Sequence, residues 1–236
     1  RPPKAETNSG RVAGMGVALV AAAAFLSIER RARAPMLPSG LFTRPAVLAA
    51  NLTGLAANFA VYGTIFSLSF YFQRTKGYSP EVTGLAFLPF MLVLTVVNIA
   101  AGGIVGRYGP RLPMAGGCAL GAAGFVLLAL IRADTSYLSL IARLLFLPVG
   151  IGLAVPAMTT MLLASVPRHL GGTASGVLNT VRQAAGAIGV ALFGSLLSMG
   201  IMEGMRTAFV GSALLVVAAG SVVLMLVRRE RRAPDA

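Results

Sequence analysis

Seven long apolar runs constrain this chain more than any other feature of its sequence. About 20 apolar residues in a helix cross the hydrocarbon core of a bilayer, and most of these runs reach that length. They are too long and too uniformly apolar to be barrel strands, so the backbone must satisfy its hydrogen bonds within helices. The sequence therefore predicts an all-α, polytopic helical membrane protein with about seven transmembrane helices. The runs cover residues 12–28, 47–72, 82–104, 113–131, 137–163, 174–199 and 207–227.

Composition supports the same class. The chain is 56% hydrophobic and only 11% charged, with a mean hydropathy of +0.81, whereas soluble domains carry about 25% charged residues. All seven acidic residues lie outside the apolar runs. The net charge of +13 comes from basic residues scattered among the connections, without an aromatic-interleaved patch, so we expect membrane lipid and no nucleic acid around the protein. The single cysteine, Cys118, permits no intrachain disulfide.

The spacing of the runs predicts the domain organisation. Short connections between long helices require an antiparallel bundle, and the one longer connection, 29–46, is rich in proline and arginine. We expect a head at 1–11, a first helix at 12–28, the linker 29–46, a six-helix unit at 47–227 and a basic tail at 228–236. The chain begins without methionine or a signal-peptide layout, so it is expected to be part of something longer.

Lysine and arginine near the ends of the runs predict the orientation. One side holds eleven, and the other holds four, or seven when the head is included. Because positive residues stay on the cytoplasmic side, we expect a multi-pass protein of the cell (inner) membrane with its linker and tail in the cytoplasm. The eleven are Arg30, Arg31, Arg33, Arg44, Arg107, Arg111, Arg168, Arg228, Arg229, Arg231 and Arg232.

Polar residues inside two runs carry most of the functional information, because each is costly in hydrocarbon. Asn179, Arg182, Gln183 and Gly186 fall on one face of a helix, where they could line a watery cavity or where the arginine could snorkel to headgroups. A second line runs along the other helix, where hydrogen bonds between helices are the alternative to a cavity. It consists of Asn51, Asn58, Tyr62, Ser69 and Gln73, with Asn98 and Arg143 as weaker candidates elsewhere.

Glycine and proline predict close packing and bending. Gly117 and Gly121 form a G-x-x-x-G pattern that favours plain helix packing over any ligand role. Proline removes a backbone hydrogen bond, so the stretch "LPVGIGLAVPAM" predicts a helix that bends during a conformational change, although static bends are also common. Its residues are Pro148, Gly150, Gly152 and Pro156. Gly109 predicts a tight turn between Arg107 and Arg111.

Four stretches resemble the major facilitator superfamily of transporters, and more narrowly the C-terminal half of its fourteen-helix drug:proton antiporter branch. "GGIVGRYGPRLPM" is similar to the cytoplasmic loop motif G-x-x-x-D-R-x-G-x-R through Gly102, Arg107, Gly109 and Arg111, with Gly106 at the acidic position. "FYFQRTKGYSPEVTGLAFLP", "GIGLAVPAMTTMLLASVP" and "GTASGVLNTVRQAAGAIGVALFG" carry the rest, and together the match covers most of residues 35–200.

The resemblance implies alternating access of two six-helix halves around a central cavity. Residues 12–28 would be the last helix of the branch's extra central pair, and the missing N-terminal half would be the main partner. Small-molecule substrate and protons would be the ligands, without cofactor or metal. Four helices of this half would line the cavity, namely 47–72, 82–104, 137–163 and 174–199. Their candidate residues are Asn51, Asn58, Tyr62, Asn98, Asn179, Arg182 and Gln183.

The acidic residues shape the expected mechanism. Proton coupling usually needs a carboxylate or histidine within the membrane, and this chain has neither there, so we expect the coupling acid in the missing half. No catalytic motif is present, so an enzyme is not expected. A non-transporting assembly subunit and an inactive truncated product remain the alternatives to half of a proton-coupled efflux transporter.

Overall fold

The computed structural model describes residues 20, 27 and 43–230, with side chains as far as 226. The expected head, nearly all of the expected helix 12–28 and most of the linker lie outside the described residues. The chain divides into two units, 1–41 and 42–236, and the fold below belongs to the second.

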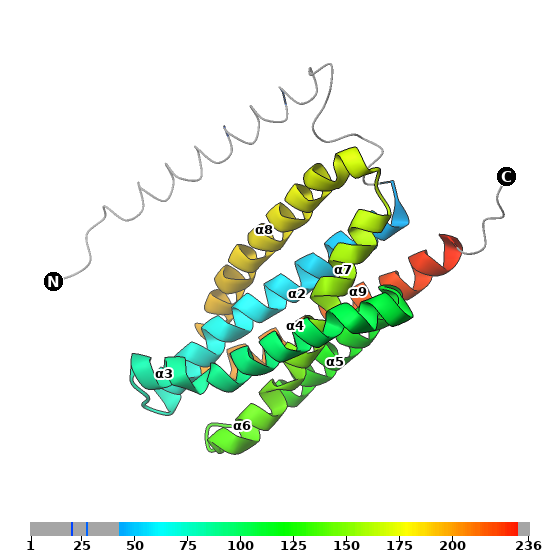
Figure 1. Cartoon of the computed structure of the whole chain (residues 1–236). Coiled ribbons are helices and arrows are strands. Elements are labelled where there is room, and N and C mark those ends of the chain that lie inside the picture. Colours follow the sequence, from blue (N-terminus) through cyan, green and yellow to red (C-terminus); the bar gives the residue numbers. More distant parts are fainter. Residues whose placement is uncertain (1–19, 21–26, 28–42, 231–236) are drawn as a thin grey trace. The chain divides into compact units, whose positions relative to one another are not determined.

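Helices make up almost the whole of this unit (Figure 1). Six stretches are long and apolar enough to cross a membrane, which confirms the six runs predicted after the linker to within a few residues. The elements are α2 (Pro45–Phe70), a π-helical turn (Tyr71–Thr75), α3 (Pro80–Ala86), α4 (Leu88–Tyr108), α5 (Arg111–Ala129), α6 (Tyr137–Leu144), α7 (Phe146–Ala164), a 3₁₀ turn (Arg168–Leu170), α8 (Gly171–Leu197) and α9 (Ile201–Glu230).

Side-chain hydrogen bonds to backbone tie the helices together at both ends of the bundle. At the end where α2 begins, Arg44 donates to the carbonyl of Ser165, just after α7. At the other end, the hydroxyl of Tyr71 donates to the carbonyl of Arg132 at 2.9 Å. We call these the basic end and the opposite end. Successive spans run between them in alternating directions, as predicted.

Charge at the two ends is less asymmetric in the described residues than in the whole chain. The basic end holds Arg44, Arg107, Arg111 and Arg168, and the opposite end holds Arg74, Lys76, Arg132 and Arg206. The excess that predicts orientation therefore comes from residues 30–33 and 228–232, whose side chains lie outside the described part. The cytoplasmic location of the basic end stays a prediction.

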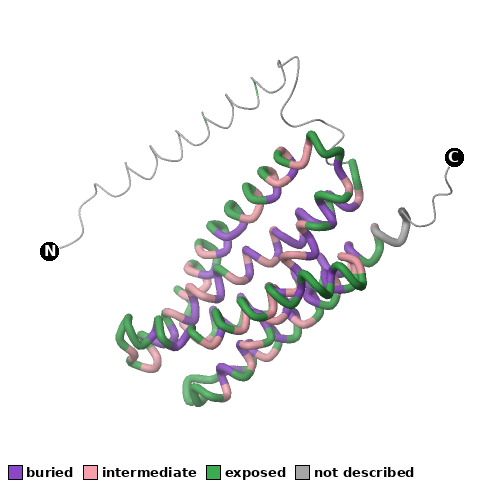
Figure 2. The backbone as a smooth tube through the Cα atoms, in the orientation of Figure 1, coloured by how far each residue is buried: buried purple, intermediate pink, exposed green. Residues whose placement is uncertain are grey.

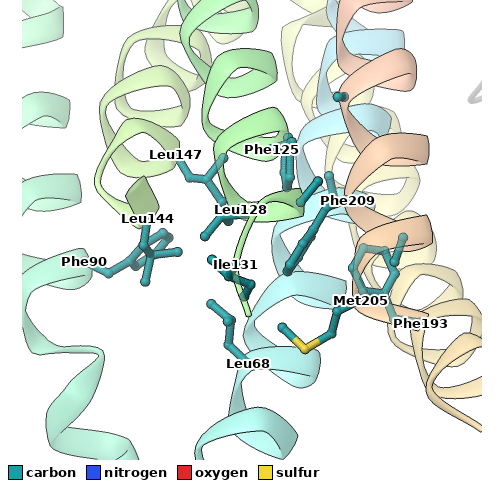
Figure 3. Packing of buried hydrophobic residues seen from close by; sticks show 14 of the residues in the cluster. Leu68, Phe90, Phe125, Leu128, Ile131, Leu144, Leu147, Phe193, Met205 and Phe209 are labelled. Atoms are coloured by element: carbon teal, nitrogen blue, oxygen red, sulfur yellow. The ribbon is translucent and has the colours of Figure 1, made fainter. Parts of the chain in front are cut away.

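The core lies where α5 meets α7 and α9. Figure 3 shows Phe125 and Leu128 of α5 between Leu147 of α7 and Phe209 of α9, all of them buried. A series of aromatic rings continues from Phe125 through Phe209 to Phe193 of α8, with ring centroids 6.5 and 6.3 Å apart. This burial joins four of the six spans into one packed body.

Two helices, α4 and α8, sit at the margins of the bundle (Figure 2). Only 17% and 22% of their most apolar windows are buried within the protein, against 56% for α5. α8 packs mainly on α2, and α4 mainly on α7. Each therefore exposes most of its circumference to something other than this unit.

Glycine brings α5 and α7 into backbone contact. A Cβ on Gly117 would lie 2.4 Å from the carbonyl oxygen of Gly150, and one on Gly150 would lie 2.6 Å from the amide nitrogen of Gly121. The G-x-x-x-G pattern thus serves helix packing, as predicted. Gly152 does the same toward α4, since its Cβ would lie 2.7 Å from the side chain of Val97.

Proline interrupts two spans that were predicted to be continuous. The break at Leu145 separates α6 from α7, because Pro148 has no N–H to donate to the carbonyl of Leu144. A break at Phe87 separates α3 from α4 two residues before Pro89, and the sequence analysis did not predict it. Pro156 lies inside α7, which continues without interruption.

The last run was predicted to begin at 207, after a connection with the sequence "MEGMR" at 202–206, and this was wrong. α9 begins at Ile201, so the charged residues Glu203 and Arg206 lie in its first turns. Gly200, with φ of +121°, completes the short turn from α8. An acidic side chain in the first turn interacts favourably with the positive end of the helix dipole. A charged segment at a membrane surface can therefore be helical.

Candidate functional site

The two predicted polar lines lie on neighbouring helices, α2 and α8, whose backbones approach closely. A Cβ on Gly189 of α8 would lie 2.2 Å from the carbonyl oxygen of Phe59, and one on Gly63 of α2 would lie 2.4 Å from the ring of Phe193. The absence of side chains at these glycines allows the contact. We call this contact between α2 and α8 the glycine seam, and Tyr62 of the polar line on α2 contacts α8 there.

Arg182 lies on the seam. The Cβ position of Gly54 on α2 is 3.0 Å from Cγ of Arg182 and 3.4 Å from its Cδ, so the arginine stem lies flat against the glycine. Arg182 is half-buried, and its Nε is fully buried without a hydrogen-bond partner. Within the stretch Arg168–Leu197, it comes 14 residues after the first and 15 before the last. Arg182 therefore lies near the middle of this stretch along the helix axis.

Asn179 and Gln183 lie beside the seam, on its open side, which is the side of α8 that no other described helix covers. Both are exposed, and at about 100° per residue they lie about 40° apart around α8, with Arg182 about 60° from Asn179. Ile188, also exposed, lies about 180° from Asn179. α8 therefore has a polar exposed flank beside the seam and an apolar exposed flank away from it, which suits an aqueous surface and a lipid surface respectively.

Tyr62 of α2 completes the open side. Its ring lies against Gly186 of α8, whose Cβ would be 3.0 Å from the ring, and the tyrosine remains 46% exposed. The structure thus brings Tyr62, Asn179, Arg182 and Gln183 to one seam. We call these four residues the polar flank. Whether solute reaches them stays a prediction.

Asn51 and Asn58 are buried on α2, and their amide donors are already engaged. Nδ2 of Asn51 donates to the carbonyl of Val47 at 2.9 Å, and Nδ2 of Asn58 donates to that of Gly54 at 3.0 Å. These bonds stay within one helix, which neither the cavity reading nor the interhelical reading anticipated. Oδ1 of Asn51 and Oγ1 of Thr53 on the same helix are both buried without a hydrogen-bond partner in the described part of the chain.

Asn98 belongs to a different helix pair. It is half-buried on α4, which packs on α7, and its Nδ2 donates to the carbonyl of Leu94 at 2.9 Å. The structure does not place it on the seam. Its assignment to the same cavity stays a prediction.

The predicted turn motif forms the connection between α4 and α5. Gly109 has φ of +74°, a backbone conformation that residues with a side chain rarely adopt, so glycine is needed for the tight reversal. Arg111 donates from Nη2 to the carbonyl of Leu224 on α9 at 3.1 Å. Arg107 lies over the ring of Tyr108, 5.5 Å from its centroid, while Gly102 is exposed with no close neighbour. The motif therefore anchors α9 at the basic end.

An aromatic cluster at the opposite end was not predicted. The π-helical turn after α2 directs Tyr71 and Phe72 into the core, and Phe72 stacks on Tyr78 with ring centroids 5.5 Å apart. Tyr137 donates from its hydroxyl to the carbonyl of Ala86 at 3.1 Å. The aromatic residues of "YFQRTKGY" were visible in sequence, but the extra residue in the helical turn was not.

Surface hollows lie away from the polar flank. One of about 430 Å³ at the opposite end is bordered by Arg132, Glu203 and Arg206, and another of about 400 Å³ by Phe70 and Arg74. A cavity of about 20 Å³ between α2, α5, α7 and α9 has room for about one water molecule. None of these is lined by Tyr62, Asn179, Arg182 or Gln183.

Comparison with known proteins identifies relatives of the chain. Residues 1–190 match the sequence profile of the Major Facilitator Superfamily. The chain is 32% identical over 192 residues to the multidrug resistance protein Stp of Mycobacterium tuberculosis, covering 81% of this chain and 36% of that protein. It is 31% identical over 196 residues to the methylenomycin A resistance protein of Streptomyces coelicolor, covering 83% and 41%.

A third relative is the multidrug efflux pump LfrA of Mycolicibacterium smegmatis, 28% identical over 189 residues, covering 80% of this chain and 38% of the pump. The chain therefore spans about two fifths of the length of the curated relatives it matches.

Proposed function

Because the chain belongs to the Major Facilitator Superfamily, we propose that it forms the C-terminal half of a secondary transporter that exports drugs or other small molecules. Export is coupled to proton entry in this proposal. The observation that carries it is the polar flank, where an arginine, two amides and a tyrosine gather beside a helix seam in an otherwise apolar bundle. Such groups are costly against lipid and are suited to a water-filled pathway. Relatives named for multidrug resistance and efflux support the substrate class.

The uncovered surfaces of α4 and α8 support the proposal that this six-helix unit is one half of a transporter. Both helices lie at the margin of the bundle and expose most of their circumference. Helices from a second half, packed along these surfaces, would enclose the polar flank between the two bodies. Since the matched relatives are more than twice as long as the matched region, they have the residues to supply that half.

The positions of the acidic residues support a coupling step that lies elsewhere in the complete transporter. Among the residues whose side chains the structure describes, the acids are Glu81 in the first turn of α3, Asp134 in a loop and Glu203 in the first turn of α9. All three belong to the opposite end, and none lies in the middle of a span. We propose that the proton-binding carboxylate belongs to the other half, and that the basic end faces the cytoplasm.

A transport assay tests the proposal. The complete coding region, expressed in a bacterium without its own drug pumps, should raise resistance to amphipathic cationic drugs. In everted vesicles, such drugs should dissipate a pH gradient. Residues 1–236 alone should do neither. Transport by these residues alone would contradict the half-transporter proposal, and the absence of transport by the complete protein, for every compound class tested, would favour a non-transporting subunit.

Variants of the polar flank test the site itself. Asn179→Ala and Arg182→Ala in the complete protein should lower resistance several-fold, because each removes a polar group from the pathway. Ser195→Ala is the matched control, since Ser195 is exposed on the same helix about 160° from Asn179. Equal resistance of all three variants, at equal protein levels in the membrane, would contradict the proposal that the polar flank lines the pathway.

A further inference from the structure

Arg182 carries a charge that nothing in the described chain compensates. It makes no hydrogen bond or ion pair with any residue the structure describes, and its Nε is buried. The single ion pair in the described part joins Arg132 and Asp134 at the opposite end, with 3.9 Å between Nε and Oδ1. A guanidinium group in the middle of a membrane span is stabilised by a counter-charge or by water, because intramembrane charges pair with one another or contact water.

The polar neighbours of Arg182 on α8 are two amide side chains with N–H donors that no described residue accepts from. Asn179 and Gln183 lie within one turn of it, are exposed, and make no hydrogen bond within the described residues. The carbonyl of Gly54, beside the arginine stem, already accepts from Asn58. The site is therefore rich in free N–H groups and lacks an anionic acceptor.

We infer that Arg182, with Asn179 and Gln183 beside it, binds a carboxylate group. The planar guanidinium fork matches the two oxygens of a carboxylate, and the amides can donate to the remaining lone pairs. This inference rests on the proposed function, because the carboxylate is expected to reach Arg182 from the transport pathway that the polar flank is proposed to line. The carboxylate belongs to an Asp or Glu in the preceding half of the transporter or to an anionic solute, and the experiments below separate these sources.

Depth argues against a lipid phosphate as the anion. Headgroup phosphates lie outside the hydrocarbon core, which is about 30 Å thick. Arg182 stands 11 residues after the start of α8, about 16 Å along the helix, and at the midpoint of the apolar stretch. Its stem lies against Gly54, within the contact between α2 and α8.

A binding experiment on this chain tests the site directly. Residues 1–236 are reconstituted in phosphatidylcholine nanodiscs and titrated with decanoate or with decyltrimethylammonium, and the unfolding temperature is followed. Decanoate should raise the unfolding temperature of the wild type, and R182Q should weaken its binding at least tenfold. R182K should be intermediate, because a lysine lacks the planar fork. R206Q, which alters an exposed arginine in the first turns of α9, is the matched control and should bind decanoate as the wild type does.

A genetic experiment on the complete transporter identifies the source of the carboxylate. R182E should abolish resistance, and changes that restore it are then selected. Restoration by exchange of an acidic residue in the preceding half for a basic one would assign the carboxylate to the protein. If R182Q instead loses export of anionic compounds while keeping that of cations, the carboxylate belongs to the solute.

The inference is overturned if decanoate stabilises R182Q as well as the wild type, or if decyltrimethylammonium is equally effective. It is also overturned if anionic phosphatidylglycerol in the nanodisc abolishes decanoate binding, because Arg182 would then hold a lipid phosphate. A complete protein that transports nothing, while decanoate still distinguishes R182Q from the wild type, would refute the proposed function and leave the carboxylate site standing.

Discussion

The glycine seam makes a sharp prediction about stability at Gly189. A methyl group there would lie 2.2 Å from the carbonyl oxygen of Phe59 and 2.9 Å from its carbonyl carbon, whereas ordinary contact begins at about 3.4 Å. These atoms of Phe59 are backbone, so no side chain can rotate away, and α2 and α8 must separate by about 1 Å. Overpacking of this kind costs about 1–3 kcal/mol.

The expected result follows from two opposing terms. Alanine gains about 0.5–1 kcal/mol over glycine in a helix interior, so Gly189→Ala should lose a net of about 1–2 kcal/mol. Gly176→Ala on the same helix is the matched control, because its Cβ would meet nothing within 4 Å, and it should be neutral or stabilising. For a chain of this size a net loss of about 1–2 kcal/mol corresponds to about 2–8 °C in the unfolding temperature.

The measurement is unfolding of the purified chain in detergent micelles, followed by far-ultraviolet circular dichroism during heating or titration with a denaturing detergent. Gly189→Ala should unfold first, and Gly176→Ala with or after the wild type. If the two variants unfold together, α2 and α8 do not touch at Gly189, and the placement of the polar flank beside α2 fails with it.

Three further predictions use the same measurement. Gly117→Ala should destabilise by about 1–3 kcal/mol, because its methyl group would meet the α7 backbone, whereas Gly116→Ala, with open space around it, should not; equal effects would contradict the α5–α7 contact. Tyr71→Phe should cost about 1 kcal/mol through loss of its hydroxyl hydrogen bond to the turn after α5, and Tyr62→Phe, which loses no bond within the described residues, should cost less. Arg111→Gln should lower stability by about 0.5–1.5 kcal/mol by releasing the α9 carbonyl, and an unchanged midpoint would show that the turn does not anchor α9.

Hydropathy predicted the number and approximate limits of the spans because it measures transfer to lipid, which dominates the placement of long apolar helices. It did not predict the interruptions at Phe87 and Leu145, since a broken helix and a continuous one have the same hydropathy. Pro148 signalled one break in advance. Pro89 gave the same signal near the start of a run, where proline is also compatible with an ordinary helix start.

The site was predictable to the level of the helix face and no further. Spacing placed Asn179, Arg182 and Gln183 on one face of a helix, and all three lie within one turn of α8, while their place in a cavity stays a prediction. Spacing could not tell whether the amides of Asn51 and Asn58 would turn toward a neighbour or toward their own helix, because that depends on side-chain rotamers. The seam had a sequence signal that was not used, since Ala185 and Gly189 form a small-x-x-x-small pair on α8.

The seam also explains how a membrane helix can tolerate Arg182. An arginine stem between two ordinary helices would force them apart, and the lost packing would add to the cost of the charge. Gly54 removes that penalty, because the stem occupies the space of the missing side chain. A methyl group on Gly54 would lie 2.9 Å from Cδ1 of Leu178 and 3.0 Å from Cγ of Arg182, so Gly54→Ala should displace the arginine stem as well as the leucine and weaken decanoate binding. If Gly54→Ala leaves decanoate binding intact, Arg182 does not need the glycine to reach its ligand, and the seam holds the helices together without positioning the charge.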